Sequence, residues 1–140
     1  EAFSSPKEFD QCDGMAEIVA GANAHQQNRR PFGFAYQSII GNEVKFNEYG
    51  TKLHLWYGCK AAPSERQHQT VSDSPEPANP SWSITSTPVD VPGFKPTSVI
   101  TVDSTKVDAT KWKKLIAKVY GDETGNSTLP TPAEVINLLK

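Results

Sequence analysis

The sequence predicts a mainly β protein with antiparallel strands and a helical C-terminal end. Between Pro31 and Val89, apolar residues recur at every second position, and polar or Pro- and Gly-rich breaks separate these runs. This is the period of strands with one buried face. Beyond residue 106 the apolar period lengthens to that of helices. We therefore expect a sheet region over residues 1–106 and a helical extension over residues 107–140.

The composition is that of one folded domain. A chain of 140 residues that is 36% hydrophobic can bury a core without disulfides or metal ions. Its 14 basic and 16 acidic residues leave a net charge of −2, which weakens any interpretation as a nucleic-acid-binding protein. The apolar runs are too short for a membrane-spanning helix or a signal peptide, so we expect no contact with a membrane.

Residues 1–30 look irregular, apart from a short strand expected at Ala16 to Ala20 after the turn "CDG". The two cysteines, Cys12 and Cys59, could form one disulfide. A domain of this size does not need such a bridge, so we expect two reduced thiols.

The run "TKLHLWYGC" predicts a strand with large side chains on both faces. Alternation places Leu53, Leu55 and Tyr57 on one face, and His54 and Trp56 on the other. Such a strand is typical of a sheet that is covered on both sides. The second cover is often a partner subunit.

Further strands are expected on either side of this run. One lies within residues 31–40, one near residue 84 and one at residues 99–102, whereas residues 60–80 read as loop with a strand around 67–72. We expect the region from Phe32 to Val102 to form one predominantly antiparallel sheet system. The predicted core of the sheet is Phe34, Leu53, Leu55, Trp82 and Ile84.

A first helix is predicted between Asp108, a favourable N-cap residue, and Gly121, a favourable C-cap residue. Its apolar residues fall at positions i, i+3, i+4 and i+7, which is one helix face and is expected to pack on the sheet. These residues are Trp112, Leu115, Ile116 and Val119.

A second helix is predicted after Thr131, which with Pro132 and Glu134 forms a capping pattern. We expect the polar linker "DETGNST" to let this short helix reach an outer or intersubunit position. The residues assigned to contacts with a neighbouring subunit are Arg29, Arg30, Val135, Ile136 and Leu139.

The sequence offers no pattern typical of catalysis, and we expect no enzyme activity, cofactor or metal site. The histidines His25, His54 and His68 lack the spacing of zinc ligands. The run "VDSTKVD" could hold a phosphate, but a strand end followed by a helix cap explains it equally well. The sequon at Asn126 is short enough to arise by chance.

Several segments of the chain resemble the later part of a family of bacteriophage major tail proteins, the tail tube subunits of long-tailed phages. The most distinctive are "CDG", "QQNRRPFGFAY", "YGTKLHLWYG", "APSE", "SDSPEP" and "TVDSTKVD". The resemblance extends over most of the chain, and "LPTPAEVINLL" at its end is also similar to such proteins.

The resemblance implies an antiparallel β-sandwich or barrel of tail-tube type that joins a homohexameric ring. Rings would stack into a tube through which phage DNA passes without specific binding, and other phage tail proteins would be further partners. The implied location is the phage tail of the virion, after assembly in the bacterial host cytoplasm, where thiols stay reduced. Tail tube subunits begin with further strands that have no counterpart before Glu1, which would leave sheet edges unpaired.

Two other classes of function remain open from the sequence. One is another structural protein of a virion, such as a capsid decoration or head-tail joining protein. The other is a carbohydrate- or ligand-binding β-sandwich module, in which Trp56, Tyr57 and Trp82 would form an aromatic platform.

Overall fold

The computed structural model describes residues 7–62, 81–123 and 125–140, so the strand expected around residues 67–72 lies outside the described residues. Of the described residues, 42% lie in strands and 21% in helices, and the sheets are antiparallel, which confirms the predicted mainly β class. It divides into two compact units. Unit 1 consists of Glu1–Phe32 and Cys59–Thr85, and unit 2 of Gly33–Gly58 and Ser86–Lys140.

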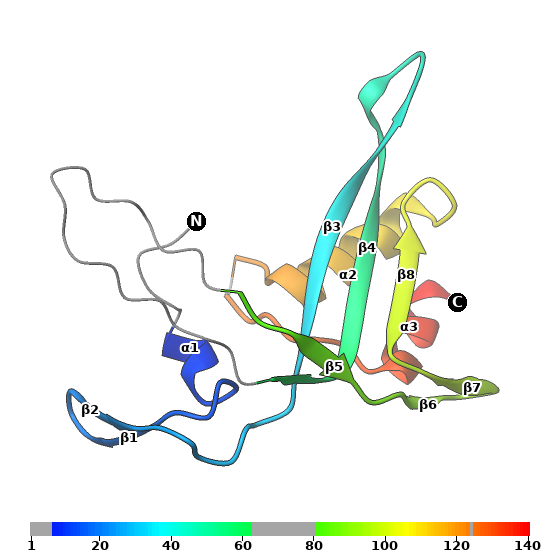
Figure 1. Cartoon of the computed structure of the whole chain (residues 1–140). Coiled ribbons are helices and arrows are strands. Elements are labelled where there is room, and N and C mark those ends of the chain that lie inside the picture. The colour runs from blue at the N-terminus through cyan, green and yellow to red at the C-terminus, as the bar shows by residue number, and fades with distance from the viewer. Residues whose placement is uncertain (1–6, 63–80, 124) are drawn as a thin grey trace, which may run out of the picture. The chain divides into compact units, whose positions relative to one another are not determined.

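The largest sheet has the strand order β3-β4-β5, and β8 also pairs with β4 (Figure 1). Its strands are β3 (Phe32–Asn42), β4 (Phe46–Ala61), β5 (Ile84–Ser86) and β8 (Val99–Asp103). β4 and β8 run antiparallel, with Leu53 opposite Val102 and Leu55 opposite Ile100.

The remaining strands form two small antiparallel pairs. They are β1 (Ala16–Val19) with β2 (Ala22–Ala24), and β6 (Val89–Val91) with β7 (Phe94–Thr97). β1 confirms the strand expected after the "CDG" turn, and a short helix α1 (Lys7–Asp10) precedes it. The expectation of one sheet system from Phe32 to Val102 is wrong, because β6 and β7 form a sheet of their own. Val91 pairs with Phe94 across Pro92 and Gly93, whose φ is +80°, so a tight turn closes β6 and β7 into a separate hairpin.

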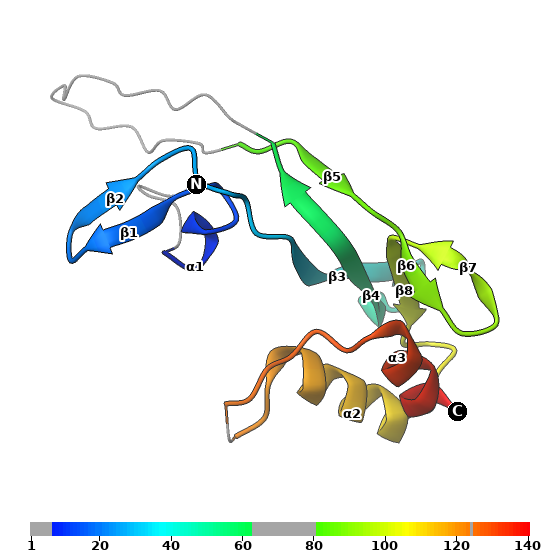
Figure 2. The same cartoon turned by 90° about the horizontal axis from the view of Figure 1, so that it is seen from below.

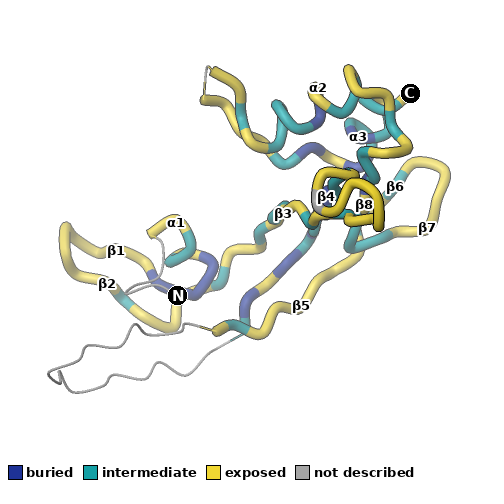
Figure 3. The backbone as a smooth tube through the Cα atoms, turned by 90° about the horizontal axis from the view of Figure 1, so that it is seen from above, coloured by how far each residue is buried: buried dark blue, intermediate teal, exposed yellow. Residues whose placement is uncertain are grey.

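β4 supplies the core of unit 2 through one of its faces. Leu53 and Leu55 are fully buried and Tyr57 is 7% exposed, whereas His54 and Trp56 between them are half-buried. The predicted alternation is therefore confirmed, and Figure 3 shows buried positions recurring along β4.

Helix α2 (Ala109–Tyr120) begins and ends where the sequence predicts. The Asp108 carboxylate accepts hydrogen bonds from the backbone N–H groups of Thr110 at 2.9 Å and Lys111 at 3.3 Å. Gly121 ends the helix with a φ of +87°, which favours glycine. The helix lies on one face of β3, β4 and β8 (Figure 2), and Leu115 is fully buried against that face. Trp112, Ile116 and Val119 pack around the same core as half-buried side chains.

Helix α3 (Pro132–Leu139) has the predicted capping box, in which the Thr131 hydroxyl and the Glu134 carboxylate each accept a hydrogen bond from the other residue's backbone N–H. Its predicted outer position is wrong. Val135 is 2% exposed within the core of unit 2, and Ile136 and Leu139 pack against that core as half-buried side chains.

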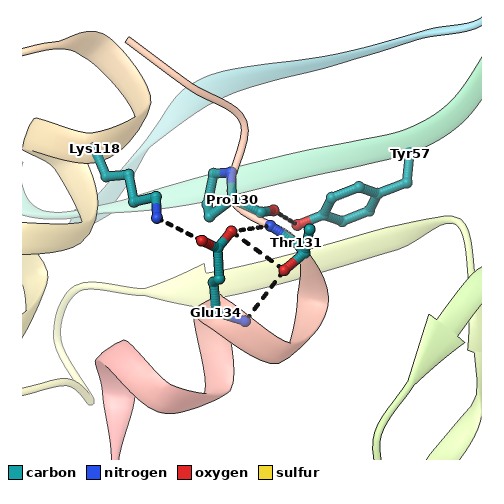
Figure 4. Close-up of polar contacts among 5 residues, drawn as sticks. All are labelled: Tyr57, Lys118, Pro130, Thr131 and Glu134. Atoms are coloured by element: carbon teal, nitrogen blue, oxygen red, sulfur yellow. Dashed lines mark hydrogen bonds and ion pairs between the residues drawn. The ribbon is translucent and has the colours of Figure 1, made fainter. Parts of the chain in front are cut away.

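The segment between the helices explains this difference, because it is held in place by hydrogen bonds. The Thr128 N–H donates to the Lys118 carbonyl at 2.8 Å, which folds the segment back along α2. The Tyr57 hydroxyl then donates to the Pro130 carbonyl at 2.8 Å, and the Lys118 ammonium bonds the Glu134 carboxylate at 2.8 Å (Figure 4). These hydrogen bonds therefore hold α3 against the sheet of unit 2.

Three of the five residues predicted to form the sheet core are not among its buried residues. Ile84 is 43% exposed because β5 is a three-residue strand with no buried position, so this prediction is wrong. Phe34 and Trp82 are half-buried. Trp82 lies in unit 1, where its ring is 4.9 Å from that of Phe9.

Candidate assembly interface

Four aromatic rings stand together on the face of the unit 2 sheet that the helices leave open. We call this set, Phe34 and Tyr36 from β3 with His54 and Trp56 from β4, the aromatic face. Across the strands, the ring centroids of Phe34 and Trp56 are 5.7 Å apart with planes at 4°, and those of Tyr36 and His54 are 4.7 Å apart at 16°. Along β3, Phe34 and Tyr36 are 6.3 Å apart at 18°. The rings are thus near-parallel and turn faces to one another.

Both ring nitrogens of His54 are engaged within this face. Nε2 lies 2.8 Å from the Ser38 hydroxyl, and Nδ1 lies 3.3 Å from the Thr101 hydroxyl. These contacts and the stacking on Tyr36 fix the imidazole in one orientation. The arrangement suits a rigid, partly polar contact surface.

The aromatic platform considered from the sequence is not formed by its three residues. Tyr57 points to the opposite face of β4 from Trp56, where its hydroxyl is bonded to Pro130. Trp56 and Trp82 belong to different units. The rings that do gather with Trp56 stack against each other, whereas a sugar needs ring faces that are open to it.

The free edge of β3 is the second feature of this interface. Among the described residues, β3 pairs with β4 alone, so its other edge has no strand neighbour. Its sequence, "FGFAYQSIIGN", contains no charged residue and no proline. Natural sheet edges are usually protected against pairing with another chain by lysine, proline, bulges or short length. This strand has neither a charged residue nor proline along its 11 residues.

Large apolar side chains are also exposed near the turn that joins β3 to β4. Ile39 is 63% exposed, Val44 82%, Phe46 75% and Tyr49 44%. Isolated exposed apolar residues are common, but several on one projecting hairpin are typical of a contact site. This hairpin forms the upper end of the sheet in Figure 1.

The two arginines assigned to intersubunit contacts both have partners inside unit 1. Arg29 donates to the Ala61 carbonyl at 2.7 Å and lies 3.5 Å from the carboxylate of Asp13. Asp13 is nearly buried, so this pair ties Arg29 to its own unit, and the intersubunit contact of Arg29 stays a prediction. Arg30 is exposed and donates to the Gln11 side chain at 3.2 Å.

The other candidate residues are engaged in local structure. The Asp103 carboxylate accepts hydrogen bonds from the hydroxyl and N–H of Thr105, and these bonds lower its pKa. Hydrogen bonds from the first backbone N–H groups of α2 likewise lower the pKa of Asp108. These contacts account for the "VDSTKVD" run as a strand end and a helix cap.

No group of three or more histidine, cysteine or acidic residues gathers to hold a metal ion within residues 7–62, 81–123 and 125–140, and His68 lies outside these ranges. Cys12 and Cys59 are both buried, and burial raises the pKa of both thiols. No helix in the described part of the chain is long and apolar enough to cross a membrane.

Comparison with known proteins found no relative of this chain. No protein-family model, curated protein or solved structure matches this chain.

Proposed function

We propose that this protein is a structural subunit of a phage virion that assembles with copies of itself, as the tail tube subunits that it resembles do. In this proposal, rings of the protein stack into a tube in the phage tail, and DNA passes through the tube without specific binding. The resemblance supports the proposal through "QQNRRPFGFAY", whose last residues form the first part of β3.

The observation that carries the proposal is the uncharged free edge of β3. A long edge without charge or proline pairs readily with another strand, because an edge strand can offer backbone N–H and carbonyl groups on the side where the described residues place no neighbouring strand. A protein that works alone gains nothing from such an edge. A subunit whose edge meets the next copy in the assembly uses every one of these groups.

The aromatic face supports the same function. Tyr36 is 44% exposed, and Phe34, His54 and Trp56 are half-buried beside it, so the face offers apolar area to a partner. Aromatic residues are enriched where proteins contact each other, since they bury a large area at a low cost in side-chain entropy.

The test measures assembly of the wild-type protein by sedimentation velocity and by negative-stain electron microscopy at rising concentration. The variants Gln37→Lys and Ile39→Lys place a charge on exposed positions of β3 and should shift the population toward the monomer. Asn137→Lys adds the same charge at an exposed position of α3 and should assemble like the wild type.

Rings that stack into tubes would support the tail tube function. Rings that never stack would contradict the tube and favour a head-tail joining protein. A wild-type protein that stays monomeric at every concentration would contradict self-assembly altogether.

A further inference from the structure

His54 is the member of the aromatic face that can carry a positive charge. Its ring stacks on that of Tyr36, with centroids 4.7 Å apart and planes at 16°. Histidine is the side chain whose charge ordinarily changes between about pH 5 and 8. The aromatic face therefore contains a group that is neutral under some common conditions and positive under others.

The two hydroxyls that contact His54 can satisfy its ring in either charge state. Nε2 lies 2.8 Å from the Ser38 hydroxyl, and Nδ1 lies 3.3 Å from the Thr101 hydroxyl. A neutral imidazole has one donor and one acceptor nitrogen, whereas a protonated imidazole has two donors. Because a hydroxyl can donate or accept, both contacts persist when the ring gains a proton. The face of the Tyr36 ring also attracts a cation stacked on it.

The charged residues near His54 on the same face of the sheet offset each other. Lys52 lies two residues before His54 on β4, and Asp103 lies two residues after Thr101 on β8, so alternation places both on this face. Lys52 and Asp103 are opposite each other in the register of β4 with β8. β3 contributes no charged residue, and the helices lie on the other face. A single subunit can therefore accept a proton on His54 without breaking a contact.

A neighbouring copy that covers the aromatic face changes this balance. It removes water from Tyr36, which is 44% exposed, and from the half-buried His54. Removing water from a charged group costs free energy unless a partner compensates the charge, whereas a neutral imidazole is buried at a much lower cost. Both ring nitrogens already face hydroxyls of their own subunit, so no ring N–H is left for a group of the neighbour to bond. Covering the face therefore favours neutral His54.

We propose that His54 makes the self-association of this protein pH-dependent: copies associate through the aromatic face while His54 is neutral and separate when it takes up a proton. This inference rests on the proposed self-assembly and names the group that regulates it. The sign follows from linkage. The state that excludes the proton, which is the assembly, is weakened as the pH falls.

The first experiment compares the wild type, His54→Gln and His25→Gln by sedimentation velocity at two pH values. About pH 8 and about pH 5.5 are suitable, because the lower value is about one unit below the ordinary pKa of histidines, where excluding one proton weakens association about tenfold. Glutamine stays neutral and offers one donor and one acceptor to the two hydroxyls. The ratio of the wild-type association constant to that of His54→Gln should therefore fall about tenfold at the lower pH. His25 is exposed in unit 1, so His25→Gln is the matched control and should keep the wild-type pH dependence.

A second pair of variants fixes the charge permanently. His54→Arg supplies a cation with a planar group that can stack on Tyr36, and it should weaken association at about pH 8 as acid weakens that of the wild type. His25→Arg adds the same charge at an exposed position and should associate normally. Circular dichroism checks that each variant is folded.

A third measurement needs no variant. Dilution calorimetry of the wild type near pH 6, in two buffers with different ionisation enthalpies, counts the protons taken up as copies separate. Proton uptake on dissociation is expected, and its absence would overturn the proposal.

The outcomes distinguish this proposal from self-assembly itself. If the wild type assembles equally well at both pH values, or if His54→Gln loses association in acid as the wild type does, the role of His54 is wrong while self-assembly stands. If the wild type does not assemble at about pH 8, both proposals fail. A loss in acid that disappears in His54→Gln and remains in His25→Gln supports the regulation by His54.

Discussion

The hydroxyl of Tyr57 on β4 donates a buried 2.8 Å hydrogen bond to the backbone carbonyl of Pro130, 73 residues further along the chain. Burial raises the pKa of Tyr57 to about 12, with a smaller contribution from the charge of Glu134. The hydroxyl therefore stays protonated and available as a donor. This single bond fastens the start of α3 to the centre of the sheet.

Tyr57→Phe should reduce the free energy of unfolding by about 1–3 kcal/mol, because it leaves the buried Pro130 carbonyl without its donor. Urea unfolding followed by circular dichroism measures the change. Tyr36→Phe, at a position that is 44% exposed, is the matched control and should have little effect. Equal effects of the two substitutions would show that the Tyr57 bond is not stabilising.

Glu134 should make unit 2 sensitive to acid. Its pKa is lowered from 4.5 to about 2, first by the hydrogen bond from Lys118 and then by the backbone N–H of Thr131. A carboxylate with a lowered folded-state pKa contributes stability above its ordinary pKa, and this contribution is lost as the pH falls from about 4.5 toward 2.

Glu134→Gln should therefore flatten the decline in unfolding free energy over this pH range, as measured by urea unfolding at a series of pH values. Glu43→Gln, at an exposed position, keeps the wild-type decline if the explanation is right. An unchanged slope in Glu134→Gln would contradict it.

A chain that ends at Gly121 should lose the cooperative unfolding of unit 2. The truncation removes Val135 from the core and uncovers Leu55 and Tyr57 of β4. Near-ultraviolet circular dichroism during heating measures the loss of fixed side-chain packing. Asn137→Ala changes only an exposed position of α3 and should unfold like the wild type. If the truncated chain melts as sharply as the whole protein, α3 is not part of the core, and the outer position expected from the sequence would be supported instead.

Cys12 and Cys59 should both be reduced and unreactive in the folded protein. Burial raises the pKa of both thiols, so little reactive thiolate is present at neutral pH. Intact-mass measurement should give the same mass with and without reductant, and maleimide should modify both residues only after unfolding in urea. A gain of two hydrogens on reduction would reveal a disulfide instead.

The features that the sequence predicts well are those set by near neighbours. Asp108 and Thr131 cap their helices through groups two to three residues away, and Leu53 and Leu55 are buried because strand alternation puts them on one face. These patterns depend on local backbone geometry, which is readable from spacing alone.

The features that the sequence misses depend on contacts between distant segments. The polar linker after Gly121 reads as flexible, and only the bonds to Lys118 and Tyr57 bring α3 back onto the sheet. Arg29 reads as a surface charge, and its contact with the Ala61 carbonyl lies 32 residues away. The positive φ of Phe46 leaves no signal in the sequence and is visible only in the fold.

The hydrogen bond between Thr51 and Ser104 belongs to a pairing of distant strands that is expected to form late in folding. It joins β4 to the end of β8 across 53 residues, whereas Lys118 and Glu134 join the two helices across only 16. Loop closure costs more entropy as the closed segment lengthens, and distant pairings slow folding. The helical hairpin is therefore expected to form first, and the pairing of β8 with β4 to be the slow step. During that delay the uncharged strand β3 stands open to other chains, so the rate of this pairing would decide how much protein reaches ordered assembly rather than aggregation.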